Sequence, residues 1–155
     1  RRQTCVIVQI NLLQETKMML QTVILAVALV TIIGPVAAIV YTNCTLAKLL
    51  NNNGITTNVP DWNCLVIATS GGKTDIIRGP NRDGYYTYGI FQINNRWWCG
   101  LNGPGGDCNI ACSKLLDDDI ADDIACAKLI YAEQGFSAWT AWVNNCQNPP
   151  AVCPC

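Results

Sequence analysis

The chain has 155 residues, which is enough for one domain with a buried core and too few for two domains of ordinary size. Half of its residues are hydrophobic, but much of that excess lies in one run near the N-terminus. Residues 39–155 carry seven Lys and Arg against ten Asp and Glu, a net charge of −3. This balance argues against a nucleic-acid-binding protein and against electrostatic attack on anionic membranes.

The first feature in chain order is an uncharged apolar run over residues 20–40, preceded by Lys17. A positive flank, an apolar stretch, a Gly-Pro pair and then small residues are the layout of a secretory signal peptide. We therefore predict a signal peptide over residues 18–38, with cleavage after Ala38, and a secreted single domain over 39–155. An uncleaved membrane anchor is the alternative, because about 20 apolar residues can span a bilayer. Residues 1–17 precede two candidate initiator methionines and are interpreted as an upstream extension.

Cysteine is unusually frequent after residue 38, where nine of the ten cysteines lie. Dense cysteine behind a secretory signal predicts disulfides. Zinc ligation is the alternative, but the chain has no histidine and no pair of C-x-x-C motifs. The odd count leaves one thiol to explain. The nine are Cys44, Cys64, Cys99, Cys108, Cys112, Cys126, Cys146, Cys153 and Cys155.

Two short helices are predicted at the start of the domain. Residues 44–51 have apolar residues at helical spacing, and an Asn-Asn-Asn-Gly run ends the pattern. Asp61 can cap a second helix that runs from Trp62 to about Ser70, where Gly71 and Gly72 stop it.

A small sheet and two more helices are predicted in the second half. Asp83-Gly84 predicts a tight hairpin turn, and residues 85–91 form a β-rich run. Residues 100–107 are a Gly/Pro/Asn loop between two cysteines. Helices are predicted over 122–133 and 137–144, before a proline-rich tail. The predicted class is α+β, with a helical lobe and a small antiparallel β lobe.

The segment Tyr-Gly-Ile-Phe-Gln-Ile-Asn-Asn-Arg-Trp-Trp-Cys over residues 88–99 closely resembles one in the c-type lysozyme and α-lactalbumin family, glycoside hydrolase family 22. Supporting marks are Asp61-Trp62-x-Cys64, Cys108-Asn-Ile-x-Cys112-Ser, Cys126-Ala-Lys128 and Ala138-Trp139-x-Ala-Trp142. The resemblance runs from Ile39 to Cys146. It implies the lysozyme fold, a cleft between the lobes and four disulfides: Cys64–Cys146, Cys99–Cys112, Cys108–Cys126, and Cys44 with either Cys153 or Cys155.

The resemblance assigns the family's two catalytic carboxylates to positions that hold Thr69 and Thr87 in this chain. A retaining glycosidase needs one carboxyl as general acid and a second about 5 Å away as nucleophile or stabiliser. A threonine hydroxyl does not ionise near neutral pH and can do neither. Glu133 and Asp83 are the alternative acids, and both are wrongly placed to substitute. We therefore predict no catalytic residues and no ordinary turnover, as in a pseudoenzyme.

The family's sugar-binding positions keep suitable residues. Flat indole faces suit sugar rings, and their N–H groups can reach an acetamido carbonyl. Two further tryptophans, Trp62 and Trp142, we interpret as core. Trp97 and Trp98 are neighbours that cannot both face inward on a strand, which favours the cleft. The predicted substrate-binding residues are Gln92, Asn94, Trp97, Trp98 and Trp139.

Five acids crowd into residues 117–123 and are destabilising unless something offsets their repulsion. Capping and dipole complementation by Asp122 and Asp123 is one interpretation for two of them. The spacing also resembles the calcium elbow of α-lactalbumins and calcium-binding lysozymes. That resemblance implies a structural Ca²⁺ with an oxygen shell. The implied ligands are the backbone carbonyls of Lys114 and Asp119 and the carboxylates of Asp117, Asp122 and Asp123.

Three functions are consistent with these residues. The first is a secreted, monomeric, non-hydrolytic protein that binds peptidoglycan or chitin-type N-acetylglucosamine polymers, in antimicrobial defence or surface recognition. The second is an active lysozyme that hydrolyses the β-1,4 bonds of bacterial peptidoglycan with an unorthodox site. The third is a regulatory subunit in the manner of α-lactalbumin, which the absence of histidine disfavours.

Overall fold

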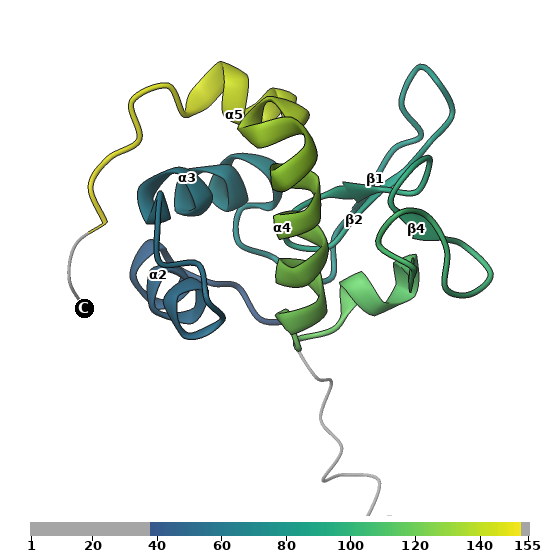
Figure 1. Cartoon of the computed structure of the whole chain (residues 1–155), viewed down its shortest axis with the longest axis horizontal. Helices are drawn as coiled ribbons and strands as arrows, with labels where there is room; N and C mark the ends of the chain where they lie inside the picture. The colour runs from purple at the N-terminus through teal and green to yellow at the C-terminus, as the bar shows by residue number, and fades with distance from the viewer. Residues whose placement is uncertain (1–37, 153–155) are drawn as a thin grey trace, which may run out of the picture. The chain divides into compact units, whose positions relative to one another are not determined.

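The computed structural model describes residues 38–152, so the predicted signal peptide, the upstream extension, Cys153 and Cys155 lie outside the described residues. The helices gather on one side and the strands on the other (Figure 1). The helices are α2 (Asn43–Asn52), α3 (Val59–Ser70), α4 (Ala121–Gln134) and α5 (Thr140–Asn145), with short 3-10 helices η1 (Cys112–Leu116) and η2 (Gly135–Ala138). The strands are β1 (Ile77–Arg78), β2 (Thr87–Tyr88), β3 (Ile93–Asn94), β4 (Cys99–Gly100) and β5 (Ile110–Ala111). The predicted α+β class is confirmed.

The β lobe contains a three-stranded antiparallel sheet in the order β1-β2-β3. A separate parallel pair joins β4 to β5. Each strand has two residues, fewer than the β-rich run 85–91 suggested. The run is broken because Gly89 and Gln92 adopt φ of 70° and 51°, and the Gln92 amide donates to the Gly89 carbonyl at 3.1 Å. A turn therefore separates β2 from β3.

The predicted turn at Asp83-Gly84 is confirmed, and Asn81 organises it. The Asn81 side-chain oxygen accepts from the backbone amides of Asp83 and Tyr85, each at 3.1 Å. Its carbonyl accepts from Gly84 at 3.0 Å, and Gly84 has φ of 82°. An Asn that bonds its own backbone downstream is a known turn former, so the residue type at position 81 was a local signal for this turn.

The prediction that Asp61 caps the second helix is wrong. Helix α3 begins three residues earlier, at Val59, after Asn58 in the left-handed conformation. Pro60 lies in the first turn, where its missing N–H removes no helical hydrogen bond. Asp61 instead accepts a hydrogen bond from Trp142 Nε1 at 3.3 Å, which joins α3 to α5. The predicted end at Ser70 is confirmed, because Gly71 follows with φ of 67°.

The predicted helix over 137–144 is interrupted at Trp139, which has φ of −109° and ψ of 106° between η2 and α5. The Trp139 side chain is buried, and its Nε1 donates to the Phe91 carbonyl at 2.9 Å. This contact spans 48 residues of sequence, so helical periodicity could not reveal it.

The core of the helical lobe centres on Trp62, which is 3% exposed. Its ring centroid lies 4.9 to 6.0 Å from those of Phe91, Tyr131, Phe136 and Trp139. Trp142 is half-buried and stacks on Phe136 with centroids 5.0 Å apart. The interpretation of Trp62 and Trp142 as core residues is confirmed.

Three disulfides have the pairing that the resemblance implied. Cys64–Cys146 joins α3 to the end of α5, Cys99–Cys112 joins β4 to η1, and Cys108–Cys126 joins the loop before β5 to α4. Cys44 is also disulfide-bonded, and both tail cysteines considered as its partner lie outside the described residues. Two of the bridges therefore anchor the β lobe to η1 and to α4, and the third lies within the helical lobe.

Candidate functional site

Thr69 lies in the last turn of α3 and is half-buried. Its hydroxyl donates to the Leu65 carbonyl at 2.8 Å, one turn back in the same helix. The carbonyls of Val66 and Ile90 lie farther away, at 3.3 and 3.4 Å. A hydroxyl has one proton, and here that proton satisfies a backbone carbonyl. The position therefore offers no acid to a substrate.

Thr87 lies in β2 and its hydroxyl donates to the side-chain oxygen of Gln92 at 2.7 Å. The Gln92 amide nitrogen donates to the carbonyls of Gly89 at 2.8 Å and Ile76 at 3.0 Å. Gln92 is only 8% exposed, so this network fixes it in place. Thr87 also pairs in register with Asn94 of β3. The structure thus brings Thr87, Gln92 and Asn94 together.

A threonine hydroxyl does not ionise near neutral pH, so neither position holds a charge or a titratable proton. Each hydroxyl donates to a neutral oxygen of the protein. The two alternative acids, Asp83 and Glu133, are exposed. What this pair of positions can do chemically is donate and accept hydrogen bonds.

The predicted sugar-binding tryptophans differ in exposure. Trp97 is 58% exposed, and the Arg96 guanidinium lies over its ring at 5.0 Å from the centroid. Trp98 and Trp139 are 4% and 7% exposed and belong to the core. Asn94 is half-buried, and its side-chain oxygen accepts from the Trp97 amide at 3.1 Å. Among the three tryptophans, Trp97 is the one with an open indole face.

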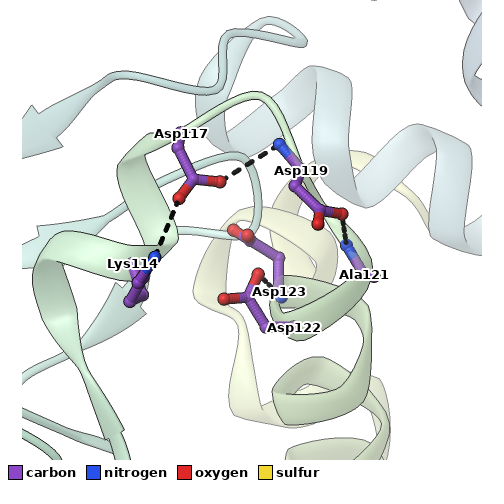
Figure 2. Close-up of polar contacts among 6 residues, drawn as sticks. All are labelled: Lys114, Asp117, Asp119, Ala121, Asp122 and Asp123. Carbon is purple, nitrogen blue, oxygen red and sulfur yellow. Dashed lines mark hydrogen bonds and ion pairs between the residues drawn. The ribbon is translucent and has the colours of Figure 1, made fainter.

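The acidic residues 117–123 lie where η1 leads through a loop into α4 (Figure 2). Asp117 forms an ion pair with Lys114, with Nζ and Oδ2 3.9 Å apart, and accepts from the Asp119 amide at 3.1 Å. Asp119 accepts from the Ala121 amide at 3.2 Å, and Asp122 accepts from the Asp123 amide at 2.9 Å. Three of the five carboxylates therefore stabilise backbone amides of the loop and the first helical turn.

Asp123 differs from its neighbours, because it is 1% exposed and neither carboxylate oxygen has a hydrogen-bond partner. Burial, the largest cause, and the nearby charges of Asp122 and Asp117 together raise the pKa of Asp123 from 3.8 to about 8. Buried carboxylates without partners are uncommon, and a cation is one thing that could satisfy them.

The fit of a metal ion to this cluster is incomplete. Hard oxygen donors are the right type for calcium, and the two bare oxygens of Asp123 favour a cation. Yet across residues 38–152 no three or more acidic, thiol or imidazole side chains gather closely enough to hold a metal. Of the three predicted carboxylate ligands, Asp117 and Asp122 each accept a hydrogen bond from a backbone amide of this segment. Calcium binding therefore stays a prediction.

Gly89, beside the Thr87–Gln92 network, lies against Leu115 and the acidic segment 117–123. With φ of 70° it packs so closely on the acidic segment that a Cβ atom there would clash with the Leu115 carbonyl and lie 2.8 Å from Asp123 Oδ1. The Tyr-Gly pair of the sequence motif is thus explained by a close backbone approach that only glycine allows.

Asp118 has no role in the predicted site, yet the structure gives it two hydrogen-bond partners. Its Oδ1 accepts from the Thr74 hydroxyl at 2.7 Å and from the Ile39 backbone nitrogen at 3.2 Å. The crowding of acids was the available signal, but these partners lie 44 and 79 residues away in sequence.

Comparisons with known proteins agree with this architecture. The model of the C-type lysozyme/alpha-lactalbumin family matches residues 39–152. Lysozyme c-1 of Anopheles gambiae is 48% identical over 118 residues, covering 74% of this chain and 84% of that protein. A lysozyme of Galleria mellonella is 46% identical over 112 residues, covering 71% and 93%.

Solved structures agree as well. A lysozyme from Equus asinus superposes with a TM-score of 0.68 at 39% identity, covering 72% of this chain and 92% of that one. A calcium-binding lysozyme from equine milk gives a TM-score of 0.66 at 38% identity with the same coverage.

Proposed function

We propose, from the premise that this chain belongs to the C-type lysozyme/α-lactalbumin family, that it binds N-acetylglucosamine polymers such as peptidoglycan or chitin without cleaving them. The observation that carries this proposal is the pair of threonine hydroxyls at the two positions assigned to carboxylates. Thr69 donates to Leu65 and Thr87 donates to Gln92, so both are satisfied within the protein.

The chemical reason is the absence of ionisable groups at both positions. General acid catalysis contributes typically about 10²–10⁴-fold, and a neutral hydroxyl cannot supply it. The second position would have to stabilise or capture a positively charged sugar carbon, which needs a carboxylate. Loss of both should leave no ordinary turnover.

Residues suited to hold sugar remain. The exposed indole of Trp97 offers a flat apolar face for a sugar ring, and the Arg96 guanidinium lies over the same ring. Gln92 and Asn94 are already fixed by hydrogen bonds, so ordering them on binding costs little entropy. We propose that Trp98 and Trp139 support this surface from the core.

A second candidate is an active lysozyme with an unorthodox site, because the relatives named above carry the name lysozyme. This reading needs another acid to replace the missing pair. A wall-lysis assay decides between the two candidates.

The experiment uses the native chain and two double variants. Thr69→Glu with Thr87→Asp introduces both carboxylates, and Thr69→Gln with Thr87→Asn is the matched neutral control. We expect no clearing of a bacterial-wall suspension by the native chain or the neutral control. Calorimetric titration with a chito-oligosaccharide should show binding by the native chain. Wall clearing by the native chain at a rate typical of lysozymes, or no sugar binding at millimolar concentration, would refute the proposal.

We also propose a structural calcium ion at the acidic segment, with the ligands named in the sequence analysis. The support is the buried Asp123 carboxylate and the similarity to a calcium-binding lysozyme. Calcium would lend positive charge to a cluster of acids, a structural role separate from sugar binding.

Secretion is the last part of the proposal. It rests on the signal-like sequence before residue 39 and on the disulfides. No helix in the described part of the chain is long and apolar enough to cross a membrane. We propose an extracellular monomer.

A further inference from the structure

We propose that hydrolysis of the Ala38–Ile39 peptide bond creates an α-ammonium group that forms an ion pair with the Asp118 carboxylate and locks the N-terminus onto the acidic segment. This inference rests on the secretion that the proposed function includes. It assigns a role to cleavage beyond release of the protein, namely completion of a charge pair in the fold.

The two partners already lie in contact in the uncleaved chain. The Ile39 backbone nitrogen, as a neutral amide, donates to Asp118 Oδ1 at 3.2 Å. The same oxygen accepts from the Thr74 hydroxyl at 2.7 Å, which fixes the carboxylate. Asp118 is half-buried and Ile39 is exposed, so solvent partly screens the contact.

The segment that follows Ile39 is held in place independently. Val40 forms a β-bridge with Lys73, and the Tyr41 amide donates to the Gly72 carbonyl at 2.9 Å. Gly72 has φ of 79°, and a Cβ atom there would clash with the Tyr41 carbonyl. Gly72 therefore allows a close approach that positions Ile39 at Asp118 whether or not the chain is cut.

Cleavage changes the charge at this position. Water adds across the peptide bond, so Ala38 leaves with a carboxylate and the Ile39 nitrogen becomes –NH₃⁺ at neutral pH. One neutral N–H donor becomes three donors with a positive charge. Charge-assisted hydrogen bonds are roughly twice as strong as neutral ones.

The surrounding charges favour this change. Asp118 lies between Asp117 and Asp119 in the acidic segment, and the charges of Asp118 and Asp119 raise the pKa of the nearby Tyr41 hydroxyl, after the larger effect of its burial. Among residues 38–152 the ion pair is Lys114–Asp117, which leaves Asp118 without a cation. Lys73 is exposed beside Val40 and forms no ion pair in this part of the chain.

The first test is the N-terminus of the secreted protein. The full chain is expressed in a eukaryotic secretory host, and the released protein is analysed by intact mass and N-terminal sequencing. We expect Ile39 as the first residue. A different first residue would overturn the proposal.

The second test is a thermodynamic cycle on the chain that begins at Ile39. Four proteins are compared in EDTA, so that no metal contributes: free or acetylated at the Ile39 amine, each with and without Asp118→Asn. Acetylation removes the positive charge and leaves every residue in place. We expect it to lower the folding equilibrium constant about fivefold in the native chain, in the range for a charged hydrogen bond that is partly screened.

In the Asp118→Asn background we expect acetylation to change the folding equilibrium constant less than twofold. Asp83→Asn, which alters an exposed acid of the hairpin turn, is the matched control and should leave the acetylation effect at fivefold. An equal effect of acetylation with and without Asp118 would overturn the proposal. The cycle involves no sugar, so its failure is distinguishable from a failure of the proposed sugar binding.

Discussion

Replacing Asp123 with Asn should stabilise the metal-free protein at pH 7. Asp123 is 1% exposed and its carboxylate oxygens lack partners, and its pKa rises to about 8 chiefly through burial. At pH 7 the folded chain therefore keeps a proton on Asp123, whereas the unfolded chain releases it. The unfolded state gains free energy from that release, and the substitution removes the difference.

The size of this stabilisation follows from the difference between the pH and the pKa of Asp123 in the unfolded chain. With an unfolded value of 3.8, pH 7 lies about three units higher, and at about 1.4 kcal/mol per unit the ceiling is about 4 kcal/mol. The buried Asn amide costs about 1–3 kcal/mol of this gain in stability if its own polar groups stay unpaired. We expect a net gain of about 1–3 kcal/mol, an order-of-magnitude figure.

The sign of the pH dependence is a separate check. Between about pH 4 and pH 8 the folded chain binds more protons at Asp123 than the unfolded chain, so this group's contribution to stability falls as pH rises. The native chain should lose stability across that window in EDTA, and the Asp123→Asn variant should lose less. In the presence of calcium the order should reverse. Calcium should bind the ionised Asp123 carboxylate of the native chain and so raise its melting temperature above that of the Asp123→Asn variant.

The assay is urea unfolding at pH 5 and pH 7 in EDTA, followed by tryptophan fluorescence. Asp107→Asn, a change to an exposed acid, is the control and should shift stability by no more than about 0.5 kcal/mol. A less stable Asp123→Asn variant at pH 7, or one with the native pH slope, would refute the reasoning. Calcium without effect on the native chain would sink the metal proposal alone.

Three further predictions concern the sugar surface and the strand end. Trp97→Ala should abolish chito-oligosaccharide binding in calorimetry and change the unfolding free energy by about 0.5 kcal/mol or less, because the Trp97 ring is exposed. Trp98→Ala should lower the unfolding free energy by about 3–5 kcal/mol, because the Trp98 ring is buried. Gly89→Ala should prevent folding or destabilise by more than about 4 kcal/mol in thermal melts, because its Cβ meets backbone at positive φ; a native-like melt would contradict this. Gln92→Ala should lower the unfolding free energy by about 1–3 kcal/mol, because the Thr87 hydroxyl loses its acceptor and the Gly89 and Ile76 carbonyls each keep only a backbone donor. An unchanged urea midpoint would count against the network.

The sequence predicted a helix end or a turn correctly where neighbouring residues determine it. The end of α3 follows from Ser70-Gly71, since the glycine adopts the left-handed conformation that stops a helix. The start of α3 was missed because Pro60 suits a first turn as well as a turn before a helix, and sequence reasoning gave the cap to Asp61 instead. The hairpin turn was found, but its organising residue, Asn81, was not.

In the candidate site, too, some features follow from the sequence and others only from the structure. The identities of Thr69 and Thr87, and hence the absence of carboxylates, need no coordinates. That each hydroxyl is satisfied within the protein required the structure, because their acceptors are set by helix and sheet geometry. Adjacent Trp97 and Trp98 could not be ranked from sequence, and the structure shows one open and one buried.

Residue types and their spacing therefore determined the family membership and the pairing of three disulfides, without three-dimensional information. The assignment of Thr69 and Thr87 to the family's catalytic positions stays a prediction. The sequence did not determine which side chains are buried, because that depends on which distant segments of the chain cover them. The raised pKa of Asp123 and the contact between Ile39 and Asp118 both arise from packing across long sequence separations. Only the tertiary structure could decide which of five similar aspartates is dry and which one meets the N-terminal segment.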